Sequence, residues 1–135
     1  MRTLVLAVGR LRPPYVDDVQ HYHRLLGRHA RVEMEELRDE ERLAGRLPER
    51  AFICLLDSAG RTFDSPGFAS FVEERRASGR DLCFVVGGPR GLDVEDADMR
   101  LSFGPMTLPH QLARVVLLEQ LFRAHKILAG EPYHY

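Results

Sequence analysis

A glycine-rich stretch, GGPRG at residues 87–91, follows the apolar run LCFVV and is the first candidate for chemistry. Glycine has no side chain, so the backbone at Gly87 and Gly88 can approach a ligand closely, while Pro89 stiffens the turn. The stretch lacks the dinucleotide-binding pattern G-x-G-x-x-G and the lysine of a phosphate-binding P-loop. Two interpretations therefore stay open, a ligand-binding loop and an ordinary tight turn.

The two cysteines lie inside apolar runs, Cys54 in AFICLL and Cys83 in LCFVV. No further ligand residue stands near either of them at the short spacing that a zinc site uses. We therefore expect two buried thiols, and neither a metal centre nor a disulfide.

Charge is distributed unevenly along a chain whose net charge is only −1. So small a net charge provides no general attraction to nucleic acid. Residues 1–31 nevertheless carry six arginines against two aspartates, which would form a local basic surface able to meet phosphates. The alternative is that arginine is simply the basic residue of this chain, which has 18 arginines and one lysine.

The length of 135 residues fits one domain, and 44% hydrophobic with 29% charged residues is typical of a globular protein. No run approaches the roughly 18 consecutive apolar residues that span a bilayer. The N-terminal run TLVLAV ends at Gly9 without a cleavage site, which predicts a buried strand rather than a signal peptide. We expect a single cytoplasmic domain, residues 1–135, with no membrane partner.

Short apolar runs alternate with segments of helical spacing along the chain. Asp64 or Ser65 can cap a helix that has Pro66 in its first turn. Strands are expected at residues 3–8, 31–37, 51–57, 81–86 and 99–103, helices at 15–27, 39–47, 67–77 and 111–128, and one or two helical turns at 93–98. Apolar strands alternating with helices indicate an α/β fold with a mostly parallel sheet flanked by helices.

Ligands of open parallel sheets bind beyond the carboxyl ends of the strands. Three predicted loops lie there, at residues 57–61, 87–91 and 104–110. The last predicted helix, 111–128, is apolar nearly all round, which is more than one face of a monomer needs. A homodimer is the expected way to bury the remainder.

Several ordered segments together resemble the RlmH family of SPOUT-type methyltransferases, which methylate N3 of a pseudouridine in large-subunit ribosomal RNA. The segments are LAVGRLRPPY, LLDSAGRTFDSPGFA, FVVGGPRGL, LSFGPMTLPHQLARVVLLEQLFRAHKI and GEPYHY. The resemblance implies a C-terminal trefoil knot and S-adenosyl-L-methionine as the methyl donor. It also implies ribosomal RNA, in the large subunit or the assembled ribosome, as the partner.

By this resemblance the methyl donor binds among Leu56, Gly87 and the segment 103–108. That segment consists of Phe103, Gly104, Pro105, Met106, Thr107 and Leu108. An adenine ring needs an apolar slot with backbone donors and acceptors at its edge, and Phe103, Met106 and Leu108 could wall such a slot. The alternative for these apolar residues is ordinary core.

The catalytic candidates implied by the resemblance are His110, Arg123, Tyr133 and His134. Histidine titrates near neutrality, so His110 and His134 are the candidates for removing the N3 proton. Tyr133 could stack on or hydrogen-bond the target base, and Arg123 could hold a phosphate. The alternatives are a cap or loop hydrogen bond for His110 and a helix-surface salt bridge for Arg123.

Two departures from the family pattern concern RNA docking. Tyr135 stands where the family usually has a basic residue, and the segment before AFICLLD is shorter and lacks the usual lysines. Donor binding is therefore implied more strongly than the RNA target. Two other functions stay open: a SPOUT methyltransferase with a different RNA target, and a non-catalytic ribosome-assembly factor.

Overall fold

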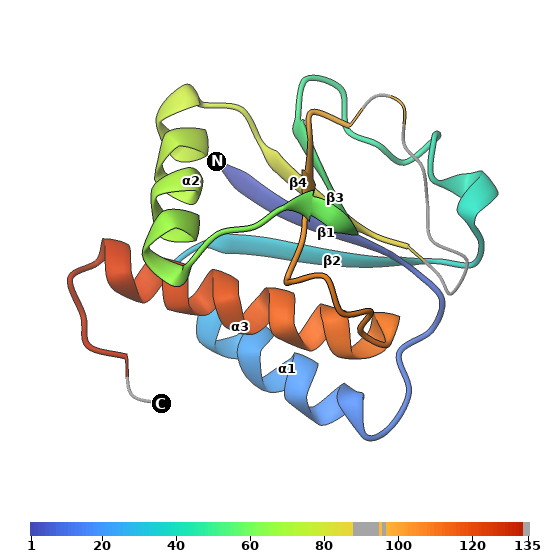
Figure 1. Cartoon of the computed structure of the whole chain (residues 1–135), viewed down its shortest axis with the longest axis horizontal. Coiled ribbons are helices and arrows are strands. Elements are labelled where there is room, and N and C mark those ends of the chain that lie inside the picture. The colour runs from blue at the N-terminus through green and yellow to red at the C-terminus, as the bar shows by residue number, and fades with distance from the viewer. Residues whose placement is uncertain (88–94, 96, 134–135) are drawn as a thin grey trace.

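The computed structural model describes residues 1–87, 95 and 97–133 (Figure 1). Strands and helices alternate along this part of the chain. The elements are β1 (Arg2–Val8), α1 (Tyr15–Leu26), β2 (Arg31–Leu37), the 3₁₀ turn η1 (Glu40–Arg42), β3 (Phe52–Arg61), α2 (Ser65–Ser78), β4 (Leu82–Val86), β5 (Met99–Leu101) and α3 (His110–Leu128). Most of the predicted glycine loop and half of the predicted turns at 93–98 lie outside the described residues.

The five described strands form one sheet in the order β2-β1-β4-β3-β5, and each neighbouring pair is parallel. The predicted α/β fold with a parallel sheet is therefore confirmed. Buried, mostly β-branched and aromatic runs form the central strands because both faces of the sheet are covered. The trefoil knot implied by the family resemblance stays a prediction.

The two faces of the sheet are covered differently. Val5, Cys54 and Phe84 pack against a core shared with α1, α2 and α3, which lie on one side of the sheet in Figure 1. On the opposite face, Leu6 and the other side chains that point to that face form a second buried cluster. Leu43, from the chain between β2 and β3, is part of it. The α/β prediction did not anticipate that the described helices would share one face.

The predicted helix at 39–47 is wrong, because only the three residues of η1 are helical. A helix this short is stable only when an apolar face packs along its whole length. The segment has little to pack beyond Leu43 and Leu47. By contrast, α2 begins as predicted, with the Asp64 carboxylate accepting a hydrogen bond from the Gly67 amide at 2.7 Å.

Strand β3 is longer than predicted, and the expected loop at 57–61 is wrong. It runs on to Arg61 through an irregularity in which Leu56 and Arg61 both pair with Leu101 of β5. A Cβ on Gly60 would lie 2.6 Å from the carbonyl carbon of Arg100. Glycine at this position thus lets the backbones of β3 and β5 approach closely at the irregularity.

A buried arginine on α3 holds the carboxyl end of β1. Arg114 is only 1% exposed, and its Nη2 donates to the carbonyls of Val8 at 3.0 Å and Gly9 at 2.7 Å. Its Nη1 donates to Glu36 of β2 at 2.7 Å. One side chain therefore fixes the first turns of α3 against the ends of two parallel strands.

We expect Arg114→Met to lower the free energy of unfolding by about 3 kcal/mol, because it leaves two backbone carbonyls and one carboxylate without their donor. Urea denaturation measures this loss. The control is Arg24→Met on α1, where the arginine is exposed and the change should stay within about 0.5 kcal/mol. A similar small effect for both variants would show that Arg114 does not anchor the fold.

Candidate functional site

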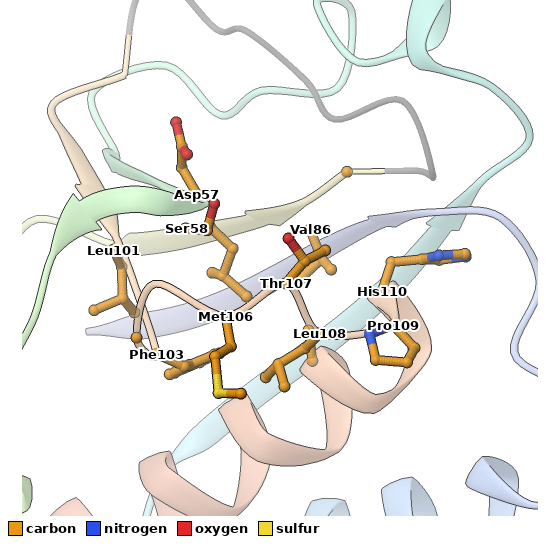
Figure 2. A pocket seen from close by; sticks show the side chains of 14 residues that line it. Asp57, Ser58, Val86, Leu101, Phe103, Met106, Thr107, Leu108, Pro109 and His110 are labelled. Atoms are coloured by element: carbon orange, nitrogen blue, oxygen red, sulfur yellow. The ribbon is translucent and has the colours of Figure 1, made fainter.

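A cavity of about 610 Å³ opens at the carboxyl edge of the sheet (Figure 2). Three stretches that are distant in the sequence form its wall: the chain at 56–58, the end of β4 at Val86 and Gly87, and the segment from β5 into α3. This is the edge at which open parallel sheets bind ligands. Its volume lies within the range of small-molecule sites in proteins.

Seven of the eight predicted donor-binding residues line this cavity. They are Leu56, Gly87, Phe103, Gly104, Met106, Thr107 and Leu108, whereas Pro105 is exposed and is not part of the wall. Met106 is 82% exposed, which excludes ordinary core for this side chain. Phe103 and Leu108 are half-buried, as the walls of an open cavity would be.

The cavity has an apolar side and a polar side. Figure 2 shows Phe103, Met106 and Leu108 together near the start of α3, with Asp57 across the cavity from them. An apolar wall beside a polar rim suits a ligand that carries both a flat apolar ring and polar groups.

Asp57 was not predicted as a site residue. Its Oδ1 accepts a hydrogen bond from the Ala59 amide at 2.9 Å, and its Oδ2 accepts one from Arg100 Nη1 at 2.7 Å. The Ala59 amide, and after it the Arg100 guanidinium, lower the pKa of the Asp57 carboxyl, so it stays charged at neutral pH. The available signal was its position at the end of the apolar run AFICLLD.

The segment that leaves β5 is fixed by a buried serine. The Ser102 hydroxyl lies 3.0 Å from the Ser58 carbonyl oxygen and 2.8 Å from that of Gly104, and it accepts a hydrogen bond from the Gly104 amide at 2.9 Å. Gly104 has a φ of 129°, which side chains strongly disfavour. The chain therefore turns sharply at Gly104 and runs along the cavity.

The predicted catalytic residues fall into two places. His110 begins α3 and lines the cavity (Figure 2). Arg123 and Tyr133 lie together, with the guanidinium carbon 4.0 Å from the centre of the Tyr133 ring. Both of them hydrogen-bond Glu119 Oε1, each at 3.0 Å. The salt bridge considered for Arg123 is thus present, and His134 lies outside the described residues.

The two places are far apart within one chain. His110 and Arg123 are 13 positions apart on α3, which corresponds to about 20 Å along the helix axis. The structure therefore does not bring Arg123 or Tyr133 to the cavity that His110 lines.

Burial and then the Glu119 carboxylate raise the pKa of Tyr133 to about 12. The phenol consequently keeps its proton at neutral pH and can donate a hydrogen bond, but it is poorly suited to act as a base. Burial likewise raises the pKa of Cys54 and of Cys83 to about 12. Both thiols are buried and free, as predicted.

Within the described ranges, no group of three or more histidine, cysteine or acidic side chains could hold a metal ion. None of the helices in that same part of the chain is long and apolar enough to cross a membrane.

Comparison with known proteins identifies the family of this chain. The family described as "Predicted SPOUT methyltransferase" matches residues 1–134. This chain belongs to the SPOUT methyltransferase family.

Three relatives of this SPOUT protein carry the name ribosomal RNA large subunit methyltransferase H. The relative from Gemmatimonas aurantiaca is 40% identical over 153 positions, covering 99% of both chains. Those from Dinoroseobacter shibae and Pelobacter propionicus are 42% and 41% identical over 154 positions, covering 99% and 100% of both chains. These alignments are longer than the 135 residues of this chain, so the relatives contain residues that it lacks.

We expect Gly60→Ala to disturb the cavity of this SPOUT protein, although Gly60 is not one of the residues that line it. The new Cβ would meet the backbone of Arg100 and push β5 away, at a cost of about 2 kcal/mol by urea denaturation. Because the segment 102–108 leaves β5 directly, the affinity for the methyl donor that the family implies should fall as well, measured by calorimetry with S-adenosyl-L-methionine as the probe. Gly45→Ala is the control, since its Cβ would come no closer than 3.9 Å to its neighbours. Equal behaviour of both variants would contradict the role given to Gly60.

Proposed function

We propose that this protein transfers a methyl group from S-adenosyl-L-methionine to large-subunit ribosomal RNA in the cytoplasm, with N3 of a pseudouridine as the acceptor. The observation that carries the proposal is one cavity, lined by seven residues that the family resemblance implies for the donor, in a chain that belongs to the family. The names of the relatives support large-subunit ribosomal RNA as the substrate.

The residues of the cavity fit this donor chemically. Phe103, Met106 and Leu108 offer an apolar surface for adenine, and the Asp57 carboxylate, ion-paired with Arg100, lies at the polar rim where the polar part of the donor would enter. Backbone groups at Gly87 and Gly104 can be approached closely because no side chain stands in the way. When bound, the donor supplies an activated methyl group.

The protein must then orient the acceptor nitrogen and take up its proton. Holding the two reactants in line provides much of the rate enhancement of such a displacement. His110, at the edge of the cavity, is the described side chain that we assign to the proton, because its imidazole can accept one and it lines the cavity. Tyr133 instead keeps its proton and donates it to Glu119, so its suitable role is to stack on the target base or to accept a hydrogen bond from it.

A homodimer would complete this site. Within one chain Arg123 and Tyr133 lie about 20 Å along α3 from His110, so a second copy is needed to bring them to the cavity. Met106 beside the cavity and Ile127 on α3 are 82% and 39% exposed, and a second copy would cover such apolar side chains. The proposal therefore includes a site made from the cavity of one copy and the α3 end and tail of the other.

A second candidate is methyl transfer to a different RNA. Tyr135 favours it, since it removes the basic side chain that usually ends the family's tail.

The direct test is incubation with labelled S-adenosyl-L-methionine and ribosomes, followed by mapping of the label. We expect label on a pseudouridine of the large subunit, and none with Gly87→Val, which blocks the close backbone approach of the donor. Calorimetry accompanies it: the wild type should bind the donor and Gly87→Val should bind it at least about tenfold more weakly. Label elsewhere would support the second candidate. Absence of donor binding by the wild type would leave a non-catalytic assembly factor.

A mixing experiment tests the shared site. Gly87→Val and Tyr133→Ala are each expected to be inactive, but dimers formed from an equal mixture should regain about a quarter of wild-type activity. Half of random dimers are mixed, and one of the two sites in a symmetric mixed dimer is then intact. If each site used residues of one chain only, every site would carry a defect and no activity would return.

A further inference from the structure

Three exposed arginines near the cavity have no ion-pair partner among the described residues, whereas many other arginines of the chain have one. Arg10, Arg12 and Arg38 have exposed side chains, and none of them forms an ion pair with a described residue. By comparison, the guanidinium groups of Arg46 and Arg76 are paired with nearby carboxylates. An exposed guanidinium without an internal partner is available to an external anion.

The backbone that carries Arg10 and Arg12 is held in place by side chains from other elements. Gln111 of α3 donates to the Arg10 carbonyl at 3.0 Å and accepts from the Arg12 amide at 2.7 Å. Between them, the Leu11 amide donates to Glu36 of β2 at 2.7 Å. Because these bonds already order the loop, ligand binding would cost little further conformational entropy there.

These arginines lie at the edge of the sheet where the cavity opens. His110 lines the cavity, and Gln111 directly follows it in α3. The loop at 10–12 is hydrogen-bonded to Gln111 and so lies next to the cavity wall. Arg38 follows Leu37, whose carbonyl accepts a hydrogen bond from the Gly9 amide at 2.8 Å. Figure 1 shows the β1–α1 connection and the start of α3 at the same end of the sheet.

Two of the acidic groups near this edge already have partners within the chain. Glu36 accepts hydrogen bonds from Arg114 and from the Leu11 amide, and Asp39 pairs with Arg42. Asp17 and Asp18 lie in the first turn of α1, where their negative charges interact favourably with the positive end of the helix dipole. Arg10, Arg12 and Arg38 therefore have no carboxylate partner among the described residues, although Asp17, Asp18, Glu40 and Glu41 lie near them in the sequence.

We propose that Arg10, Arg12 and Arg38 bind backbone phosphates of the RNA that delivers its target base to the cavity. The inference rests on the proposed function, and it adds the surface on which the substrate docks. Guanidinium groups bind phosphates through two parallel hydrogen bonds, and such contacts set the position of a nucleic acid without reading its sequence. A base that enters the cavity must be flanked by phosphates that cross this edge of the sheet.

The test compares two double variants of the full-length protein that remove the same charge. Arg10→Ala with Arg12→Ala deletes the proposed contacts, and Arg24→Ala with Arg28→Ala deletes two exposed arginines near the other end of α1. The measurements are ribosome binding by sedimentation at several salt concentrations, donor binding by calorimetry, and methyl transfer to ribosomes. All the altered side chains are exposed, so both variants should fold.

We expect the first variant to bind ribosomes about tenfold more weakly and to reduce the slope of log affinity against log salt by about 1.5, since each phosphate contact contributes roughly 0.7 to 0.9. Its donor affinity should equal that of the wild type, and the KM for ribosomes should rise with little change in kcat. The control variant should resemble the wild type in all of these. Equal losses in both variants, or no loss in the first, would overturn the proposal. If the wild type binds ribosomes through these arginines but transfers no methyl group, the proposed function fails while the docking surface stands.

Discussion

The burial of one guanidinium organises this protein. Arginine cannot lose its proton, and removing its charge from water costs several kcal/mol unless acceptors replace the lost solvent. Arg114 therefore requires the carbonyls of Val8 and Gly9 and the carboxylate of Glu36 to stay where they are. This requirement fixes where α3 begins relative to β1 and β2. The neighbouring turn of α3 holds His110 in the cavity wall, so the site inherits its geometry from the same contact.

The other wall of the cavity depends on how closely two strands can approach. Gly60 lets β5 lie against the irregular end of β3, and the Ser102 hydroxyl then connects the chain after β5 to Ser58. The turn at Gly104 carries the chain from there along the apolar side of the cavity. A polar rim at Asp57 and an apolar wall at 103–108 thus come from segments that meet only because β3 and β5 pair.

Helix α3 separates the work of the protein into two regions. Residues of its first turn line the cavity and hydrogen-bond the loop at 10–12. Further along the helix, Glu119 accepts hydrogen bonds from Arg123 and from Tyr133 of the chain that follows α3. A rigid helix cannot bring its own two ends together, so the proposed chemistry requires two copies of the chain. The same reasoning separates three tasks in the proposed function: donor binding in the cavity, RNA docking at the arginine surface, and base recognition by the tail of the second copy.

The sequence by itself determined the elements that local patterns govern. Apolar runs predicted the buried strands, Asp64 and Pro66 predicted the start of α2, and the ordered motifs predicted seven residues of the cavity wall. Only the tertiary structure decided the rest. The SAG stretch has the composition of a turn, yet it lies within β3 because Leu56 and Arg61, on either side of it, both pair with Leu101 of β5. Arg114 has the sequence features of an exposed helix residue, and its acceptors lie 78 to 106 positions away. Contacts over such distances leave no local pattern, because they arise only when the strands and helices have assembled.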